Sequence, residues 1–323
     1  MKQNTTTFFS FLAVLSFFFL LFSFPTKKLS KDKIHQQHFN EKYKIFSINK
    51  PEDLSFCNEK VNLNSHDIWE RMDKELLKNI YWQSNTILYL KRANKFFPII
   101  EPILKANNIP DDFKYLALIE SGLEDVVSPS GAAGFWQILK GTAKEYGLEV
   151  NIAIDERYNL EKSTEVACKY LRKAYERFGS WTLAAASYNK GQNGVRRLTE
   201  KQGTNNYYNL HLNSETSRYV FRIIAVKEIL ENPKKYGFIY REKDLYVMPK
   251  YKTIEIDTTI VDLADFATTN GINYKLLKQL NPWLRTTSLP DKSRRKYILK
   301  IPTDYQYLLQ KRQNGVVLHF PVP

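Results

Sequence analysis

The chain has 323 residues, of which 43% are hydrophobic and 25% are charged, with 12 glycines and 13 prolines. This composition excludes a mini-protein, a collagen-like chain and a wholly disordered chain, and the length is typical of about two globular domains. Lys and Arg outnumber Asp and Glu by 48 to 34, and the formal net charge of +14 favours anionic partners. Nucleic acid, anionic lipid and an acidic polymer all meet that condition.

An uncharged apolar run extends from Phe8 to Phe24 and is flanked by lysines. This pattern predicts an export signal within residues 1–25. Its length of about 17 residues suits a cleaved signal peptide and also a retained membrane anchor, so both interpretations stay open. We expect export to the periplasm of the cell envelope, which favours envelope polymers and membrane surfaces as partners. It argues against nucleic acid.

Residues 26–66 are polar, rich in lysine and without sustained periodicity, which predicts a linker or extended arm. Cys57 in this segment and Cys168 either pair in an oxidising compartment or stay as isolated thiols, because the sequence does not fix their separation. The histidines show no metal-ligand spacing. We therefore expect neither a metal nor another cofactor.

Apolar residues at helical spacing begin at Ile68 and continue through most of residues 67–235. The expected helices cover residues 86–104, 111–121, 135–146, 160–178, 181–188 and 215–230, after a first one that begins at Ile68. Glycine follows several of them, as it often does where a helix ends. Residues 67–235 are thus predicted to form an all-α domain.

The sequence changes character near Phe238. Strand-like segments at 238–248, 252–256 and 297–301 surround two helical segments at 260–269 and 274–280. We interpret residues 236–250 as a connector, 251–303 as a small α+β module of βααβ order, and 304–323 as a tail. The predicted fold class is mainly α, with an all-α domain followed by this module.

One carboxylate lies on an apolar helical stripe. The stripe consists of Phe113, Leu116, Ala117 and Glu120, at positions i, i+3, i+4 and i+7. Burial would raise the pKa of Glu120 and keep the group protonated near neutral pH, as a general acid requires. Glu120 is also close to the helix end, where its side chain could point into solvent. Periodicity alone leaves both interpretations open.

Four short motifs follow one another from this glutamate. They are Glu120-Ser121-Gly122, a Ser/Ala/Gly-rich loop ending in Gly134-Phe135-Trp136-Gln137, Ala186-Ser187-Tyr188-Asn189, and Glu215-Thr216-x-x-Tyr219. Their order resembles the lysozyme-like lytic transglycosylases of bacterial cell walls (SLT domain, glycoside hydrolase family 23), most closely the membrane-bound type D group. The resemblance covers residues 100 to 232. Ser187 stands where the family usually has alanine, and the loop before Gln137 is one residue short, which leaves Ser128 less firmly aligned.

The resemblance implies a lysozyme-like catalytic domain that cleaves peptidoglycan glycan strands without water. The bond would be the β-1,4 link between N-acetylmuramic acid and N-acetylglucosamine. Glu120 would act as acid and then as base, and the product would be 1,6-anhydromuramic acid. The resemblance assigns substrate binding to Ser128, Gln137, Tyr188, Asn189 and Tyr219.

Two other functions stay open at this point. A hydrolytic muramidase on the same fold would need a second carboxylate to position water, and Glu124, Asp125 and Asp155 are the nearest candidates. A catalytically inactive peptidoglycan-binding scaffold would use the groove only to hold the wall. Phe135 and Trp136 either form the floor of that groove or pack in the core.

The C-terminal module resembles a lysin motif (LysM), a βααβ module that binds N-acetylglucosamine in chitin or peptidoglycan. The likeness rests on Thr258-Thr259-Ile260, Leu280-Asn281-Pro282 and Tyr297-x-Leu299-x-Ile301-Pro302. Ile256-Asp257 replaces the usual Gly-Asp, and the glycine before the last strand is missing. The module therefore either binds glycan or only packs against the catalytic domain.

Overall fold

The computed structural model describes residues 30–42, 44–290 and 295–304. The expected signal or anchor lies outside the described residues, as does nearly all of the expected tail. No helix within the described ranges combines the length and the apolar character that crossing a membrane requires. The chain divides into two compact units, Met1–Ile48 and Asn49–Pro323. In the first unit, helix α2 covers Lys31–Lys42.

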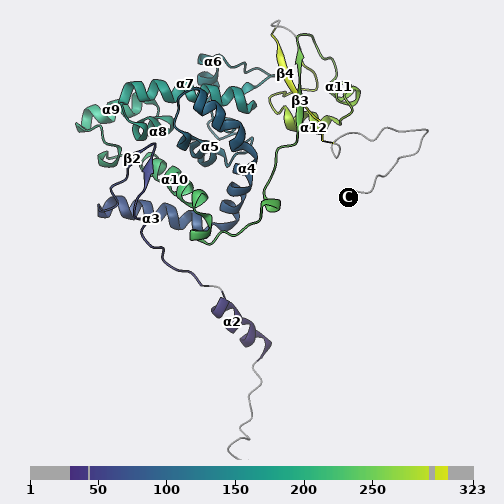
Figure 1. Ribbon diagram of the computed structural model, residues 1–323. Coiled ribbons are helices and arrows are strands. Elements are labelled where there is room, and N and C mark those ends of the chain that lie inside the picture. The colour runs from purple at the N-terminus through teal and green to yellow at the C-terminus, as the bar shows by residue number, and fades with distance from the viewer. Residues whose placement is uncertain (1–29, 43, 291–294, 305–323) are drawn as a thin grey trace, which may run out of the picture. The chain divides into compact units, whose positions relative to one another are not determined.

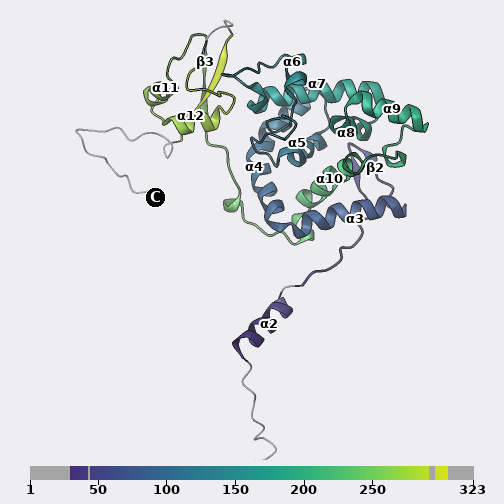
Figure 2. The same ribbon diagram turned by 180° about the vertical axis from the view of Figure 1, so that it is seen from behind.

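The second unit begins with a group of packed helices. They are α3 (His66–Tyr81), α4 (Gln83–Ala106), α5 (Lys114–Ser121), α6 (Lys140–Glu145), α7 (Leu160–Phe178), α8 (Trp181–Lys190), α9 (Gln192–Gln202) and α10 (Ser214–Glu231). Helix α10 contacts α3, α5 and α8, and α7 contacts α4 and α8 (Figures 1 and 2). Met72, Leu116 and Phe221 are fully buried between these helices. This packing brings α5, α8 and α10 together, and they carry three of the four sequence motifs.

The predicted helix over residues 135–146 is wrong in its first half, because only Lys140–Glu145 are helical. Gly134 and Gln137 have positive φ angles of 76° and 45°, which a right-handed helix does not allow. A Cβ atom at Gly134 would lie 2.1 Å from the backbone oxygen of Arg157, so only glycine fits there. The second motif is therefore a tight loop before α6.

Part of the segment expected to be an arm packs against the helices. Strands β1 (Ser55–Phe56) and β2 (Glu59–Lys60) form an antiparallel hairpin. Phe56 is fully buried and meets the Phe113 ring edge-on, with 5.2 Å between centroids. The backbone N–H of Cys57 donates to Asp112, with 2.6 Å between nitrogen and oxygen. Cys57 and Cys168 are both buried free thiols.

The hairpin also reaches helix α8. The Glu59 carboxylate accepts from the backbone N–H groups of Trp181 at 2.5 Å and Thr182 at 3.0 Å. These are donors that a helix leaves unpaired at its first turn. The Lys227 ammonium on α10 meets the Asp112 carboxylate at 2.7 Å. The β1–β2 hairpin thus connects the beginnings of α5 and α8 with α10.

The C-terminal module has the predicted βααβ order. Strand β3 (Tyr251–Ile256) pairs antiparallel with β4 (Tyr297–Pro302), and helices α11 (Leu263–Thr269) and α12 (Tyr274–Leu280) lie between them in the chain. The strand-like segment 238–248 contains only a short 3-10 turn at Glu242–Asp244. The predicted fold class, mainly α with a small α+β module, is confirmed.

The module is fixed to the helical domain by backbone and core contacts. The Arg285 N–H donates to the Ala153 oxygen at 2.8 Å, and the Asp155 N–H donates to the Trp283 oxygen at 2.9 Å. Ile154 of the helical domain belongs to the same buried cluster as Leu284 of the module. The two parts therefore share one core at this junction.

Candidate functional site

Glu120 lies in the last turn of α5, which ends at Gly122 in a left-handed conformation with φ of 65°. Its side chain accepts a hydrogen bond from the Tyr219 hydroxyl on α10. The residue is half-buried and turned toward α10, which settles the choice between core and solvent. Burial raises the pKa of Glu120, and the charge of Glu215 adds to the rise, while the Tyr219 hydrogen bond and Arg222 oppose it.

Two tyrosines surround this carboxyl group. The Tyr188 hydroxyl on α8 donates to the Trp136 backbone oxygen at 2.7 Å. Burial and the charge of Glu120 raise the pKa values of Tyr188 and Tyr219 well above the ordinary value. Both phenols therefore stay protonated and act as hydrogen-bond donors beside Glu120.

Asn189 is held by the fourth motif. Its amide nitrogen donates to the Glu215 carboxylate at 3.0 Å, and its oxygen accepts from the Thr216 hydroxyl at 2.8 Å. These two bonds fix the orientation of the amide. Glu215 and Thr216 belong to the same motif as Tyr219, but no local pattern in the sequence predicts that they support Asn189.

Gln137 and Ser128 stabilise the loop that carries the second motif. The Gln137 amide nitrogen donates to the backbone oxygens of Val126 at 3.0 Å and Gly134 at 2.8 Å. The Ser128 hydroxyl accepts from the Ala132 N–H at 3.1 Å. Both predicted side chains are therefore already engaged in shaping the loop before any ligand is bound.

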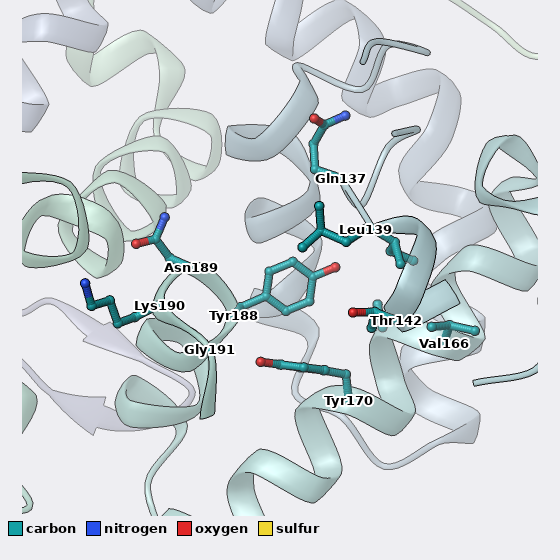
Figure 3. Close-up of a pocket in the computed structure, with 11 residues that line it drawn as sticks. Gln137, Leu139, Thr142, Val166, Tyr170, Tyr188, Asn189, Lys190 and Gly191 are labelled. Atoms are coloured by element: carbon teal, nitrogen blue, oxygen red, sulfur yellow. The ribbon is translucent and has the colours of Figure 1, made fainter. Parts of the chain in front are cut away.

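A cavity of about 330 Å³ opens beside these residues (Figure 3). Gln137, Tyr188 and Asn189 line it, whereas Glu120, Ser128 and Tyr219 do not. The structure thus gathers three of the predicted residues in the lining of this cavity, whereas Glu120 and Tyr219 are bonded to each other outside that lining. Sequence reasoning missed Tyr170 of α7, which lines the cavity and meets the Tyr188 ring edge-on at 5.3 Å.

Trp136 is a core residue. It has no solvent exposure, and its indole N–H donates to the Thr164 hydroxyl at 2.8 Å. Phe135 is also buried, at 5% exposure. Of the two interpretations left open for these rings, core packing is therefore correct for Trp136, and Phe135 does not line the cavity beside Tyr188.

The three candidates for a second catalytic carboxylate lie in ion pairs or in a different cavity. Asp155 is buried in an ion pair with Arg157, with 2.7 Å between charged atoms. Glu124 pairs with Arg92 on α4. Asp125 lines a different cavity from the one beside Tyr188. None of the three lines the cavity beside Tyr188.

Comparisons with known proteins find similarity in two separate regions of the chain. Residues 97–211 match the transglycosylase SLT domain family, and residues 252–305 match the soluble lytic transglycosylase C-terminal LysM-like domain family. The membrane-bound lytic murein transglycosylases D of Escherichia coli strains K12 and CFT073 are each 27% identical over 237 residues. That alignment covers 71% of this chain and 51% of each relative, so the chain spans about half their length.

Among solved structures, the 70 kDa soluble lytic transglycosylase of Escherichia coli aligns with a TM-score of 0.38 and 17% identity. This alignment covers 62% of this chain and 40% of that chain. The two family matches therefore show similarity to a transglycosylase SLT domain and, after it in the chain, to a LysM-like domain of the soluble lytic transglycosylase C-terminal type.

Proposed function

We propose that this protein is a peptidoglycan lytic transglycosylase with Glu120 as its single catalytic carboxyl group. The observation that carries the proposal is a half-buried glutamate, with a raised pKa, that accepts a hydrogen bond from Tyr219. A carboxyl group whose pKa is raised keeps its proton to a higher pH than an ordinary glutamate does, and it can give that proton to a leaving oxygen. The SLT family match and the type D relatives support the choice of substrate.

In the proposed reaction, Glu120 first donates its proton to the oxygen of the β-1,4 bond between N-acetylmuramic acid and N-acetylglucosamine. The bond to C1 breaks, and the leaving sugar carries the proton away as a hydroxyl group. The Glu120 carboxylate then accepts the proton of the muramoyl C6 hydroxyl, whose oxygen closes on C1. The product is a 1,6-anhydro sugar, no water is consumed, and Glu120 ends protonated as it began.

The remaining site residues would bind and orient the glycan. Gln137 and Asn189 line the cavity and offer amide groups to sugar hydroxyl or acetamido groups. Tyr219 donates to Glu120, the Tyr188 hydroxyl donates to the Trp136 backbone oxygen and so fixes the Tyr188 ring, and Ser128 shapes the loop beside the site. We propose all five as substrate-binding or orienting residues.

This function calls for export to the periplasm, where the predicted signal or anchor in residues 1–25 would direct the protein. Peptidoglycan glycan strands are the proposed partner, and residues 8–24 would provide any membrane attachment. A hydrolytic muramidase is less well supported, because Asp155 and Glu124 are held in ion pairs with arginines. An inactive scaffold would have no use for a half-buried acid beside two tyrosines.

The decisive experiment is mass spectrometry of the muropeptides that the purified protein releases from peptidoglycan. We expect products that end in 1,6-anhydromuramic acid, which are lighter than reducing ends by one water. Reducing ends would instead identify a hydrolase and contradict the proposed mechanism. The absence of any released product would favour the scaffold.

A further inference from the structure

A second cavity, of about 410 Å³, begins three residues after Glu120 in the chain. Leu123, Glu124 and Asp125 form one wall. The other walls come from α4, from the connector at Tyr246–Pro249 and from α12 of the LysM-like module. It shares no lining residue with the cavity of Figure 3. Because one wall belongs to the module, this cavity exists only while the module is docked.

The lining combines apolar surface with charge. Phe96 and Phe135 meet edge-to-face at 4.8 Å, and Leu276 and Leu280 of α12 are half-buried opposite them. Side chains of this kind favour contact with aliphatic groups. The cavity is thus large enough and apolar enough to receive a short chain rather than a single ion.

Two opposite charges in this cavity lack a bonded partner. Arg92 and Glu124 pair with each other. In the part of the chain that the structure describes, Lys95 and Asp125 form neither a hydrogen bond nor an ion pair, although the Lys95 ammonium lies over the Phe96 ring at 5.0 Å. A ligand with one group of each sign could therefore pair with both.

Both groups have lost part of their hydration. Burial lowers the pKa of Lys95, although the charge of Asp125 opposes this. Asp125 keeps solvent-accessible surface, but neighbouring protein atoms exclude part of the water around its carboxylate. This desolvation raises the pKa of Asp125 to about 6, although the positive charges of Arg285 and Lys95 oppose the rise. Partly dehydrated charges gain more from a direct partner than fully hydrated ones do.

We propose that this cavity, the stem site, binds the peptide stem of peptidoglycan, with Lys95 pairing a free carboxylate and Asp125 a free ammonium group. The proposal rests on the proposed function, because the stem is attached to the muramic acid that Glu120 would attack. The distance is within reach. Three peptide units of about 3.8 Å limit the Cα separation of Glu120 and Leu123 to about 11 Å, and an extended peptide spans roughly 3.3–3.6 Å per residue.

Calorimetric titration of the full chain with a stem tripeptide tests the proposal. The probe is N-acetyl-L-alanyl-γ-D-glutamyl-meso-diaminopimelate, whose one free amine is on diaminopimelate, together with one analogue in which this amine is also acetylated and one whose carboxylates are amidated. Asp125→Asn should weaken binding of the unmodified peptide about tenfold, the effect of losing roughly 1.4 kcal/mol, and should leave the acetylated analogue unaffected. Lys95→Gln should likewise weaken binding of the unmodified peptide about tenfold and should leave binding of the amidated analogue unaffected.

Lys105→Gln is the matched control, because Lys105 is exposed on the same helix and does not line the cavity. Wild-type protein that fails to bind the peptide at millimolar concentration would overturn the proposal. The proposal would also be overturned if Asp125→Asn and Lys95→Gln weakened binding of the modified and unmodified peptides equally. Cleavage of peptide-free glycan to anhydro products without stem binding would overturn the stem site alone. Stem binding without anhydro products would support the site and overturn the proposed function.

Discussion

The Glu120 site and the LysM-like module are built from different kinds of contact. At Glu120, side chains from three helices converge, and the links between them are hydrogen bonds such as those from Tyr219 and between Thr216 and Asn189. The module instead joins its neighbour through backbone hydrogen bonds and shared apolar residues, with Leu284 fully buried. The hydrogen bonds at Glu120 set the orientation and protonation of side chains, whereas the contacts of the module set only where it lies against the helical domain.

This difference explains why the module tolerates departures from the usual LysM sequence. Residues after α12 are used for packing, because the Trp283 backbone oxygen accepts from Asp155 and the Trp283 ring stacks with Tyr297 at 5.7 Å. Packing of this kind requires apolar volume rather than a particular glycine before β4. We therefore interpret the module mainly as a wall of the SLT domain.

The largest effect is expected from removing the acid. Glu120→Gln should lower the rate of glycan cleavage by about 10²–10⁴-fold, since general acid–base catalysis is lost, with glycan binding unchanged. Glu145→Gln, at an exposed glutamate in α6, is the control. Undiminished cleavage by Glu120→Gln would contradict the assignment of the acid.

The same variant should be more stable than the wild type at neutral pH. Because burial raises the folded-state pKa of Glu120, the stability that this group contributes is present below the unfolded value near 4.5 and is lost as the pH rises. Glutamine does not ionise and avoids that loss. Thermal unfolding should therefore show a higher Tm for Glu120→Gln at pH 7 and a smaller difference at pH 4.

The shared core predicts that the module and the helical domain unfold together. Leu284→Ala should lower the free energy of unfolding by about 2–5 kcal/mol, the usual range for truncating a buried leucine, in a single transition. Ile298→Ala is the control, because Ile298 on β4 is 57% exposed. Two separate transitions in calorimetry would show instead that the module is an independent domain.

Tyr219→Phe should affect the rate and its pH dependence. Hydrogen bonds to charged groups contribute about 1.5–3 kcal/mol, so a rate loss of roughly 10–100-fold is expected. The Tyr219 hydroxyl stabilises ionised Glu120 and lowers its pKa, so its removal should raise that pKa further. The alkaline limb of the rate profile should therefore move to higher pH.

Tyr208→Phe provides the comparison, because the buried Tyr208 hydroxyl has no hydrogen-bond partner among the residues that the structure describes. That variant should keep the wild-type pH profile. If the alkaline limb of Tyr219→Phe moved to lower pH, the hydrogen bond to Glu120 would not have the role assigned here.

Local patterns predicted the helices that are rich in apolar residues or begin at a capping residue. The predicted ranges 160–178 and 274–280 coincide with α7 and α12, where asparagine caps each first turn. Helix α9 was missed, because its sequence is mostly polar and only Val195 and Thr199 of its residues are buried. The convergence of the four motifs on Glu120 came from their resemblance to a family, since local spacing does not determine which helices meet.

The β1–β2 hairpin carried no local signal, because its bonds are made to residues far away in the chain. Glu59 caps α8 across 122 residues from Trp181, and Phe56 packs on Phe113. A polar segment with two short strands looks like an arm until its partners are known. The hairpin lies before residue 97, where the SLT match begins.

The smallest effect is expected from a change in this hairpin, which positions α8 and takes no part in the chemistry at Glu120. Glu59→Gln keeps the size of the side chain but removes the negative charge at the start of α8. A lost cap or helix-terminus charge costs about 0.5–2 kcal/mol of stability. Because α8 carries Tyr188 and Asn189, we expect a several-fold higher KM with little change in kcat. Glu52→Gln, at an exposed position in the same segment, should change neither quantity. A fall in kcat with an unchanged KM would mean that the hairpin acts on Glu120 through α5 rather than on the glycan-binding residues of α8.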